Sequence, residues 1–256
     1  MLINAVIIIL REVLEASLII GVLLALAHLN LLSKTWCVKA LILGGIGAVV
    51  YAENLVLISG LYEGLGQEIV NIFLYVFIFF FVVIIIYSMR DKQYSHMTIS
   101  AMLACVAMAL IREGSEVIIY VQGFSMIPEL FTPVLIGSSI GAGSGLSIGV
   151  IVYYLIVNLP FVYGVRLAFF ILVLIAGGMV SQATQMLLQA NLIMSQLPIW
   201  DTSKIVSEQS IVGQVLFAMM GYEATPTPLQ VSLYVLSILL TSFLAASSLR
   251  HTKRMK

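Results

Sequence analysis

Seven long runs of apolar residues, separated by short polar breaks, leave this chain few ways to fold. A helix needs roughly 20 mostly apolar residues to cross the hydrocarbon layer of a membrane, and each run is about that long or longer. We therefore expect an all-α integral membrane protein with seven transmembrane helices. Their predicted bounds are Leu2–Leu29, Val38–Leu61, Ile69–Met89, Thr98–Phe124, Leu130–Leu159, Val165–Ala190 and Leu229–Leu249.

The composition fits a lipid environment better than a water-soluble fold. Apolar residues make up 61% of the 256 residues and charged residues only 9%, whereas a soluble domain is about half apolar and a quarter charged. We expect one membrane domain over residues 1–256, with no separate soluble domain. It would comprise helices 1–3 (about 2–89), helices 4–6 (about 98–190), an outer loop (about 191–228) and helix 7 (about 229–249). The net charge of zero does not point to a nucleic-acid partner.

Lysine and arginine fall mainly in alternate loops, and short loops rich in these residues stay in the cytoplasm. Nine of the twelve basic residues lie on one side of the predicted membrane, and the other side has Lys204 alone. We therefore place the N-terminus outside and the C-terminus in the cytoplasm, which requires an odd number of spans. The nine residues are Lys34, Lys39, Arg90, Lys92, Arg166, Arg250, Lys253, Arg254 and Lys256.

Two of the predicted helices contain the same charged pattern, Arg-Glu-x-x-Glu, at residues 11–15 and 112–116. Each charged side chain near the bilayer centre costs roughly 2.5–3.5 kcal/mol on insertion scales, so six of them in two helices require a reason. Residues three and four apart share one face of a helix. Glu12 and Glu15 should therefore point the same way, and Arg11 should reach Glu15.

On facing helices, the two pentads would form a cluster of four carboxylates and two guanidinium groups. Carboxylates alone in lipid would take up protons, whereas arginines can keep some of them ionised and a passing cation can neutralise the rest. Carboxylate oxygens are hard ligands that suit iron, manganese, calcium or magnesium. Alternatively, each pentad is a buried ion pair that locks helix packing, but the surplus of two acids favours a cation site. The expected metal ligands are Glu12, Glu15, Glu113 and Glu116, with Arg11 and Arg112 as supporting charges.

The two pentads run in opposite directions through the predicted membrane, and three spans separate them. Helices 1–3 and 4–6 therefore resemble an inverted repeat, to which helix 7 is an addition. Transporters commonly place their site at the interface of such halves, near the midplane of the bilayer. We expect the cluster to lie at that interface.

Several polar residues outside the pentads are candidates for the route of a cation. The sixth predicted helix carries a stripe of three glutamines, which could line a pathway or hydrogen-bond across helices. Six acidic residues are assigned to the outer side and Asp91 alone is clearly inside, although outer loops must be polar in any case. The candidates for the entrance or pathway are Glu53, Glu68, Gln182, Gln185 and Asp201, and Gln189 completes the stripe.

The fifth predicted helix has a glycine at every fourth position from Gly137 to Gly149. Small residues at this spacing let helix backbones approach closely. We expect this glycine stripe to pack against the second predicted helix, where Gly44, Gly45 and Gly47 cluster.

The doubled Arg-Glu-x-x-Glu motif in a seven-span protein resembles the oxidase-dependent iron permease family, which includes fungal high-affinity ferric permeases and bacterial counterparts. The commonest pentad of that family is Arg-Glu-Gly-Leu-Glu, from which this chain departs at Val13 and Ser115. Glu68 and the apolar run that follows are similar to the family's third span. The segment from Gly213 to Pro226 is similar to the family's last outer loop.

The resemblance implies a permease rather than an enzyme, with iron as the transported substrate and no permanent cofactor. It implies that the four pentad glutamates bind or relay Fe2+ or Fe3+, and that a separate iron oxidase or periplasmic iron-binding protein is a partner. The short chain favours a multi-pass protein of a bacterial inner membrane. The alternatives are a permease for manganese or lead, a non-transporting membrane subunit, or a di-iron oxidoreductase. Di-iron centres in helix bundles normally use Glu-x-x-His, and this sequence has none.

Overall fold

The computed structural model describes residues 2–90, 92–194 and 196–254, and these residues form helices and connecting segments with no strand. Asp91 and Lys256, both assigned to the inner side from the sequence, lie outside the described residues. The helices are α1 (Leu2–Leu29), α2 (Thr35–Glu53), α3 (Leu55–Ser59), η1 (Tyr62–Gly64), α4 (Gly66–Ser88), η2 (Lys92–Tyr94), α5 (Ser95–Gly123), α6 (Pro128–Val157), α7 (Phe161–Gln189), α8 (Ile211–Met220) and α9 (Pro228–Arg254).

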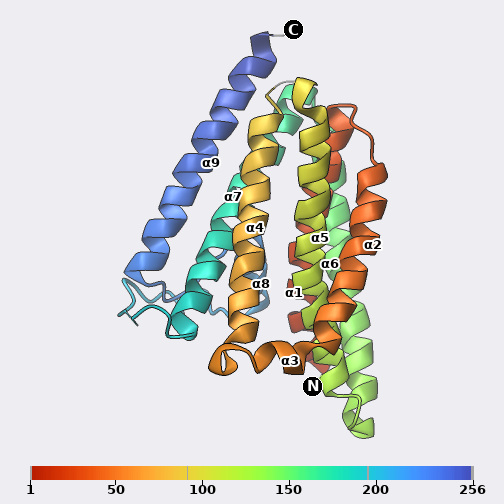
Figure 1. Ribbon diagram of the computed structural model, residues 1–256, viewed down its shortest axis with the longest axis vertical. Coiled ribbons are helices and arrows are strands. Elements are labelled where there is room, and N and C mark those ends of the chain that lie inside the picture. Colours follow the sequence, from red (N-terminus) through yellow and green to blue (C-terminus); the bar gives the residue numbers. More distant parts are fainter. Residues whose placement is uncertain (1, 91, 195, 255–256) are drawn as a thin grey trace.

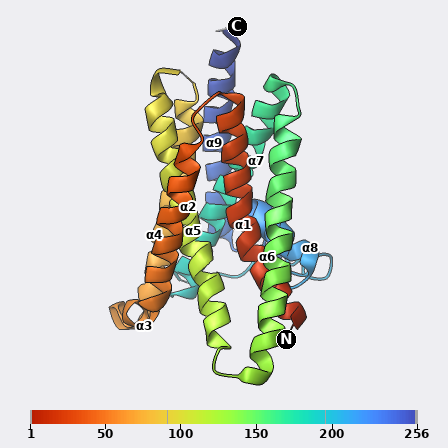
Figure 2. The ribbon, with the colours of Figure 1, turned by 90° about the vertical axis from the view of Figure 1, so that its right-hand side faces the viewer.

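The long helices run side by side along the long axis of the molecule (Figure 1). The N-terminus, α3 and α8 lie in the lower half of Figures 1 and 2, and the C-terminus lies at the upper end. α9 stands at the edge of the bundle, where it packs against α7 and α4. The short helices α3 and α8 therefore gather toward one end of the bundle.

Five of the described helices are long and apolar enough to cross a membrane by length and composition: α2, α4, α6, α7 and α9. The chain is therefore a multi-pass membrane protein. The other two long helices, α1 and α5, have 28 and 29 residues and carry the charged pentads.

The second predicted span, Val38–Leu61, is too long. α2 ends at Glu53, and the side chain of Asn54 turns back to donate a hydrogen bond to the carbonyl oxygen of Val50 at 2.8 Å. The apolar residues that follow form the separate short helix α3. The other predicted spans agree with the helix bounds within five residues.

The long connection at 191–228 also contains a helix that we did not expect. α8 begins after Ser210, whose hydroxyl accepts a hydrogen bond from the backbone N–H of Gly213 at 3.0 Å. It ends at Gly221, which has a φ of 68° in the left-handed region that glycine adopts without steric cost.

The glycine stripe of α6 packs against α1, so the prediction that it contacts the second span is wrong. A Cβ placed on Gly141 would lie 2.6 Å from the carbonyl oxygen of Val6, and one on Gly149 would lie 2.7 Å from that of Ser17. The stripe meets successive residues of α1 in ascending order, so the two helices run parallel. Small residues here let the two backbones touch.

The glycines of α2 serve the same purpose against α5. A Cβ placed on Gly44 would lie 2.6 Å from the side chain of Leu110, and one on Gly47 would lie 2.5 Å from that of Ile111. This pair also meets in ascending order and runs parallel. Each helix with a pentad is thus backed by a helix with small residues, α6 behind α1 and α2 behind α5.

An apolar core fills the space between α1, α4, α5 and α7 on the side of the pentads away from the N-terminus. It includes apolar side chains that are at most 2% exposed, among them Leu18, Ile78, Met102, Val106, Leu172 and Ile175. The pentads therefore lie directly beside a closely packed apolar layer.

Candidate metal centre

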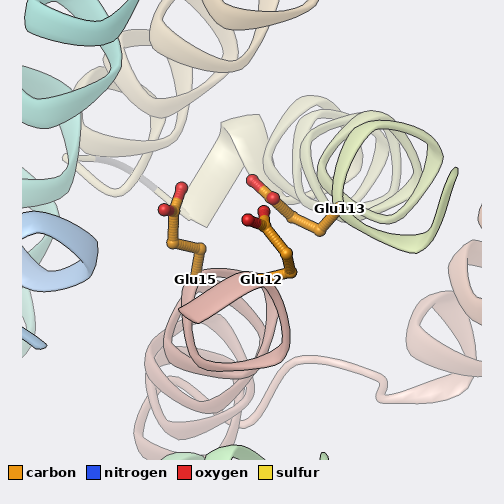
Figure 3. Close-up of side chains that lie close together, drawn as sticks. All are labelled: Glu12, Glu15 and Glu113. Carbon is orange, nitrogen blue, oxygen red and sulfur yellow. The ribbon is translucent and has the colours of Figure 1, made fainter. Parts of the chain in front are cut away.

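Three carboxylates from two helices meet inside the bundle. Glu12 and Glu15 come from α1 and Glu113 from α5, and each side chain points into the space between the helices (Figure 3). One oxygen from each of the three lies within 4.8 Å of the others. All three residues are at most 2% exposed. We call this group the carboxylate triad.

The local packing of each pentad explains why its glutamates face inward. The middle residue of the first pentad, Val13, turns toward α6, where its Cβ lies 3.1 Å from the position of a Cβ on Gly145. In the second pentad, Gly114 turns toward α2, where a Cβ on it would lie 3.1 Å from the Cβ of Ala48. Since a helix turns by about 100° per residue, the flanking glutamates point away from these contacts with α6 and α2 and toward each other.

Arg112 lies at the centre of the charges. Its Nη1 is 3.3 Å from Glu12 Oε2 and 3.6 Å from Glu15 Oε2, and it also pairs closely with Glu113. Its Nη2 is 3.1 Å from Glu116 Oε1, the ion pair four residues apart that the sequence suggests. The Arg112 side chain is only 4% exposed, so one guanidinium serves all four pentad glutamates.

Arg11 has a different position. In the described part of the chain its ion pair is with Glu12, whose Oε1 accepts from Arg11 Nε at 2.8 Å, so the predicted pairing with Glu15 is wrong. Glu15 turns instead toward Arg112. Arg11 is 29% exposed, and its guanidinium carbon lies 5.4 Å from the ring centroid of Phe217 on α8. The same motif therefore places its arginine centrally in one copy and peripherally in the other.

Glu116 stands apart from the carboxylate triad and lines a cavity of about 250 Å³. Its side chain is 24% exposed, against 2% or less for the triad. The cavity extends from the pentads to the segment just before α8. It is lined by Arg11, Tyr75, Arg112, Glu116, Gln182, Gln185, Met186, Gln189, Glu208, Gln214 and Phe217.

Gln182 of α7 connects this cavity with the triad. Its Nε2 donates a hydrogen bond to Glu15 Oε2 at 3.3 Å, and the residue is only 2% exposed. Among the described residues, neither Gln182 Oε1 nor Glu15 Oε1 has a hydrogen-bond partner. Buried oxygens are rarely left without a partner. Two of them in neighbouring side chains form an acceptor-rich position that suits a cation.

Gln185, one turn further along α7, donates to Glu223 Oε1 at 3.4 Å. Burial raises the pKa of the Glu223 carboxyl, which lies in the segment between α8 and α9. Gln189 lines the cavity as well, so all three glutamines of the predicted stripe belong to the cavity lining.

The remaining predicted residues do not line the cavity. Glu53 is exposed and accepts a hydrogen bond from Gln122 at 3.1 Å. Glu68 lies in the first turn of α4. Asp201 is exposed and accepts from Ser203, and these hydrogen bonds lower the pKa of its carboxyl. None of the three is among the residues that line the cavity.

Sequence reasoning missed Tyr75 and Phe217, whose rings lie against the two arginines. The guanidinium carbon of Arg112 is 4.7 Å from the ring centroid of Tyr75. A weak signal was present, because Asn71 and Tyr75 lie one turn apart in the otherwise apolar middle of α4. Phe217 gave no signal, since nothing in the sequence showed that α8 would fold back onto α1.

A comparison with protein families gives a match over nearly the whole chain. The model of the iron permease FTR1 family matches residues 2–254, nearly the whole chain. Neither the curated proteins nor the solved structures contain a significant match.

Proposed function

Because the chain belongs to the iron permease FTR1 family, we propose that it carries iron through the site formed by its two pentads. The observation that supports this site is the carboxylate triad, in which three buried oxygens from two helices lie within 4.8 Å of one another. Hard oxygen ligands at this separation suit iron in either common oxidation state. In the proposal, Glu12, Glu15 and Glu113 bind the ion, and Glu116 transfers it from the cavity to these three residues.

In this proposal all seven long helices cross the membrane, with the N-terminus outside and the C-terminus in the cytoplasm. α1, α2 and α4 form one half of an inverted repeat, α5, α6 and α7 the other, and α9 is an addition at the edge. The packing supports this division. An inverted repeat that pairs the first helix of one half with the second helix of the other must do so twice, as α1–α6 and α5–α2 do.

Iron would enter from the outer side through the cavity. Glu208 and Gln185 line its outer part, and Glu116 lies at its inner end beside Arg112. Release into the cytoplasm requires the apolar core on the far side of the triad to open. Permeases alternate access in this way by moving one half of the repeat against the other.

The chain itself would need no permanent cofactor in this scheme. A separate iron oxidase or a periplasmic iron-binding protein would deliver the ion to the outer face. In the proposal, residues 1–256 form a single membrane domain in the inner membrane of a bacterium.

The proposal is tested by uptake of radioactive iron into proteoliposomes that contain the purified protein, with Fe2+ and Fe3+ supplied in separate experiments. We expect Glu113→Gln to abolish uptake. The matched control is Glu129→Gln, which makes the same change at an exposed position in the first turn of α6. Competition by Mn2+ and Pb2+ distinguishes an iron permease from one for another divalent cation.

Two further measurements distinguish a permease from an oxidoreductase and from a non-transporting subunit. Oxidation of Fe2+ by the purified protein would indicate an oxidoreductase rather than a permease. Wild-type protein that is folded but neither transports nor binds iron would indicate a non-transporting subunit, with pentads that only hold the helices together. Binding without transport would mean that a partner must hand over the ion.

A further inference from the structure

We propose that Arg112 is an internal cation that holds the place of iron in the carboxylate triad, and that arriving iron displaces it toward Tyr75 and Glu116. This inference rests on the proposed function. It assigns to Arg112 the role of a competitor for the site rather than that of a permanent support.

The first argument is that Arg112 and a metal ion need the same oxygens. Nη1 of Arg112 lies 3.3 Å from Glu12 Oε2 and 3.6 Å from Glu15 Oε2, and it pairs with Glu113. These three residues are the carboxylate triad. A hard cation binds carboxylate oxygens at about 2.0–2.6 Å, so it would occupy the space that the guanidinium now fills. Two like charges at such a separation also repel strongly in the low dielectric of a protein interior.

The second argument is that the displaced side chain has a place to go. Its other nitrogen, Nη2, already lies 3.1 Å from Glu116 Oε1, one turn further along the same helix. The ring of Tyr75 lies 4.7 Å from the guanidinium carbon and can hold a cation on its face. Arg112, Tyr75 and Glu116 all line the cavity of about 250 Å³. The movement that the proposal requires is therefore a change of the Arg112 rotamer.

The third argument is that Arg112 is incompletely satisfied where it is. Within the described part of the chain its buried Nε has no hydrogen-bond partner. A guanidinium held only as a structural clamp normally has its donors satisfied. An unsatisfied Nε therefore suits a guanidinium that can move out of the carboxylate triad.

The two pentad arginines are unequal in this respect. Arg11 has its ion pair with Glu12 and is 29% exposed, so it lies at the margin of the triad. Removing its charge should affect metal binding much less than removing that of Arg112. A support role shared by both arginines would make the two substitutions equivalent.

The test is the affinity of the purified protein in detergent for Mn2+, a redox-stable probe, and for Fe2+ under anaerobic conditions. We expect R112Q to bind the metal about tenfold more tightly or better, which is about 1.4 kcal/mol, and R11Q to change the affinity less. R112K keeps the charge and should therefore gain less affinity than R112Q. The matched control is R166Q, which removes an exposed arginine that also lies over a tyrosine ring, that of Tyr163. It should bind as wild type does.

A second pair of variants keeps the inference testable if R112Q does not fold. Y75L removes the ring that would hold the displaced guanidinium and should weaken metal binding, whereas Y75F keeps the ring and should weaken it less. Unchanged or weaker binding by folded R112Q, or equal affinities of Y75L and Y75F, would overturn the inference.

Failure of this inference can be told from failure of the proposed function. If wild-type protein binds metal, E113Q does not, and folded R112Q binds no more tightly than wild type, only the role of Arg112 is wrong. If wild-type protein and R112Q both fail to bind Mn2+ and Fe2+, the site itself is wrong and this inference fails with it.

Discussion

The backbone of α6 touches that of α1 at Gly141 and Val6. A Cβ on Gly141 would lie 2.6 Å from the carbonyl oxygen of Val6, a distance that real Cβ atoms do not adopt. The obstacle is backbone rather than a side chain, so no change of rotamer can relieve it. The glycine therefore sets the separation of the two helices, and α1 carries two of the three triad carboxylates.

Gly141→Ala should lower the stability of the protein by about 1–3 kcal/mol, because the two helices must move apart to admit the methyl group. Gly143→Ala on the same helix is the control, since a Cβ there meets nothing within 4 Å. Alanine is the better helix former, so this control should be as stable as wild type or slightly more so. Thermal unfolding in detergent compares the two, and equal melting temperatures would contradict the close contact.

Gln182→Leu should reduce iron uptake by about tenfold or more, because a hydrogen bond to a charged group is worth about 1.5–3 kcal/mol. Gln182 donates to Glu15 at 3.3 Å and is buried. Gln189→Leu makes the same change at an exposed residue of the same cavity and should have a smaller effect. Uptake rates in proteoliposomes measure both, and equal losses would show that Gln182 has no special relation to the triad.

Glu208→Gln should raise the iron concentration needed for half-maximal uptake and leave the maximal rate unchanged. Glu208 lines the cavity and its Oε1 accepts from the N–H of Ala224 at 2.6 Å, which glutamine can also do. The fold of this segment is therefore preserved while one negative charge near the entrance is lost. Asp201→Asn removes a charge from an exposed turn outside the cavity and should change neither quantity. A shift of the same size in both variants would mean that only the overall charge of the outer face matters.

Ser203→Cys should react with a membrane-impermeant maleimide in intact cells, and Ser33→Cys should react only after the cells are opened. Both serines are exposed, and they lie on opposite sides of the membrane in the proposed orientation. The native thiols, Cys37 and Cys105, are buried and should give little background. The reverse pattern of labelling would invert the proposed topology.

The sequence predicted the helices well because long apolar runs are an unambiguous signal in a chain with few charges. It failed at Asn54, since the residues of α3 continue the apolar run and only the local turn separates them from α2. The prediction of which helix packs against the glycine stripe was also wrong. Spacing shows that a helix packs closely, whereas the identity of its neighbour depends on contacts between residues more than a hundred positions apart, such as Ser17 and Gly145.

The pentads could be recognised because charges inside apolar runs are costly and therefore rare. Their unequal roles could not be predicted, because Arg11 and Arg112 have the same local pattern of glutamates. What distinguishes them is tertiary: Phe217 lies against one guanidinium and Tyr75 against the other. The cavity depends in the same way on the segment before α8, which packs back onto the bundle.

The pairing of Arg112 with Glu12 also has a consequence for the order in which the chain is made. The two residues are 100 positions apart, so at about 5–20 residues per second α1 leaves the ribosome roughly 5–20 s before its central counter-charge exists. During that interval, Arg11 alone balances Glu12 and Glu15. Until α5 arrives, the first helix carries one glutamate without a counter-charge, which raises the free-energy cost of placing that helix in the bilayer.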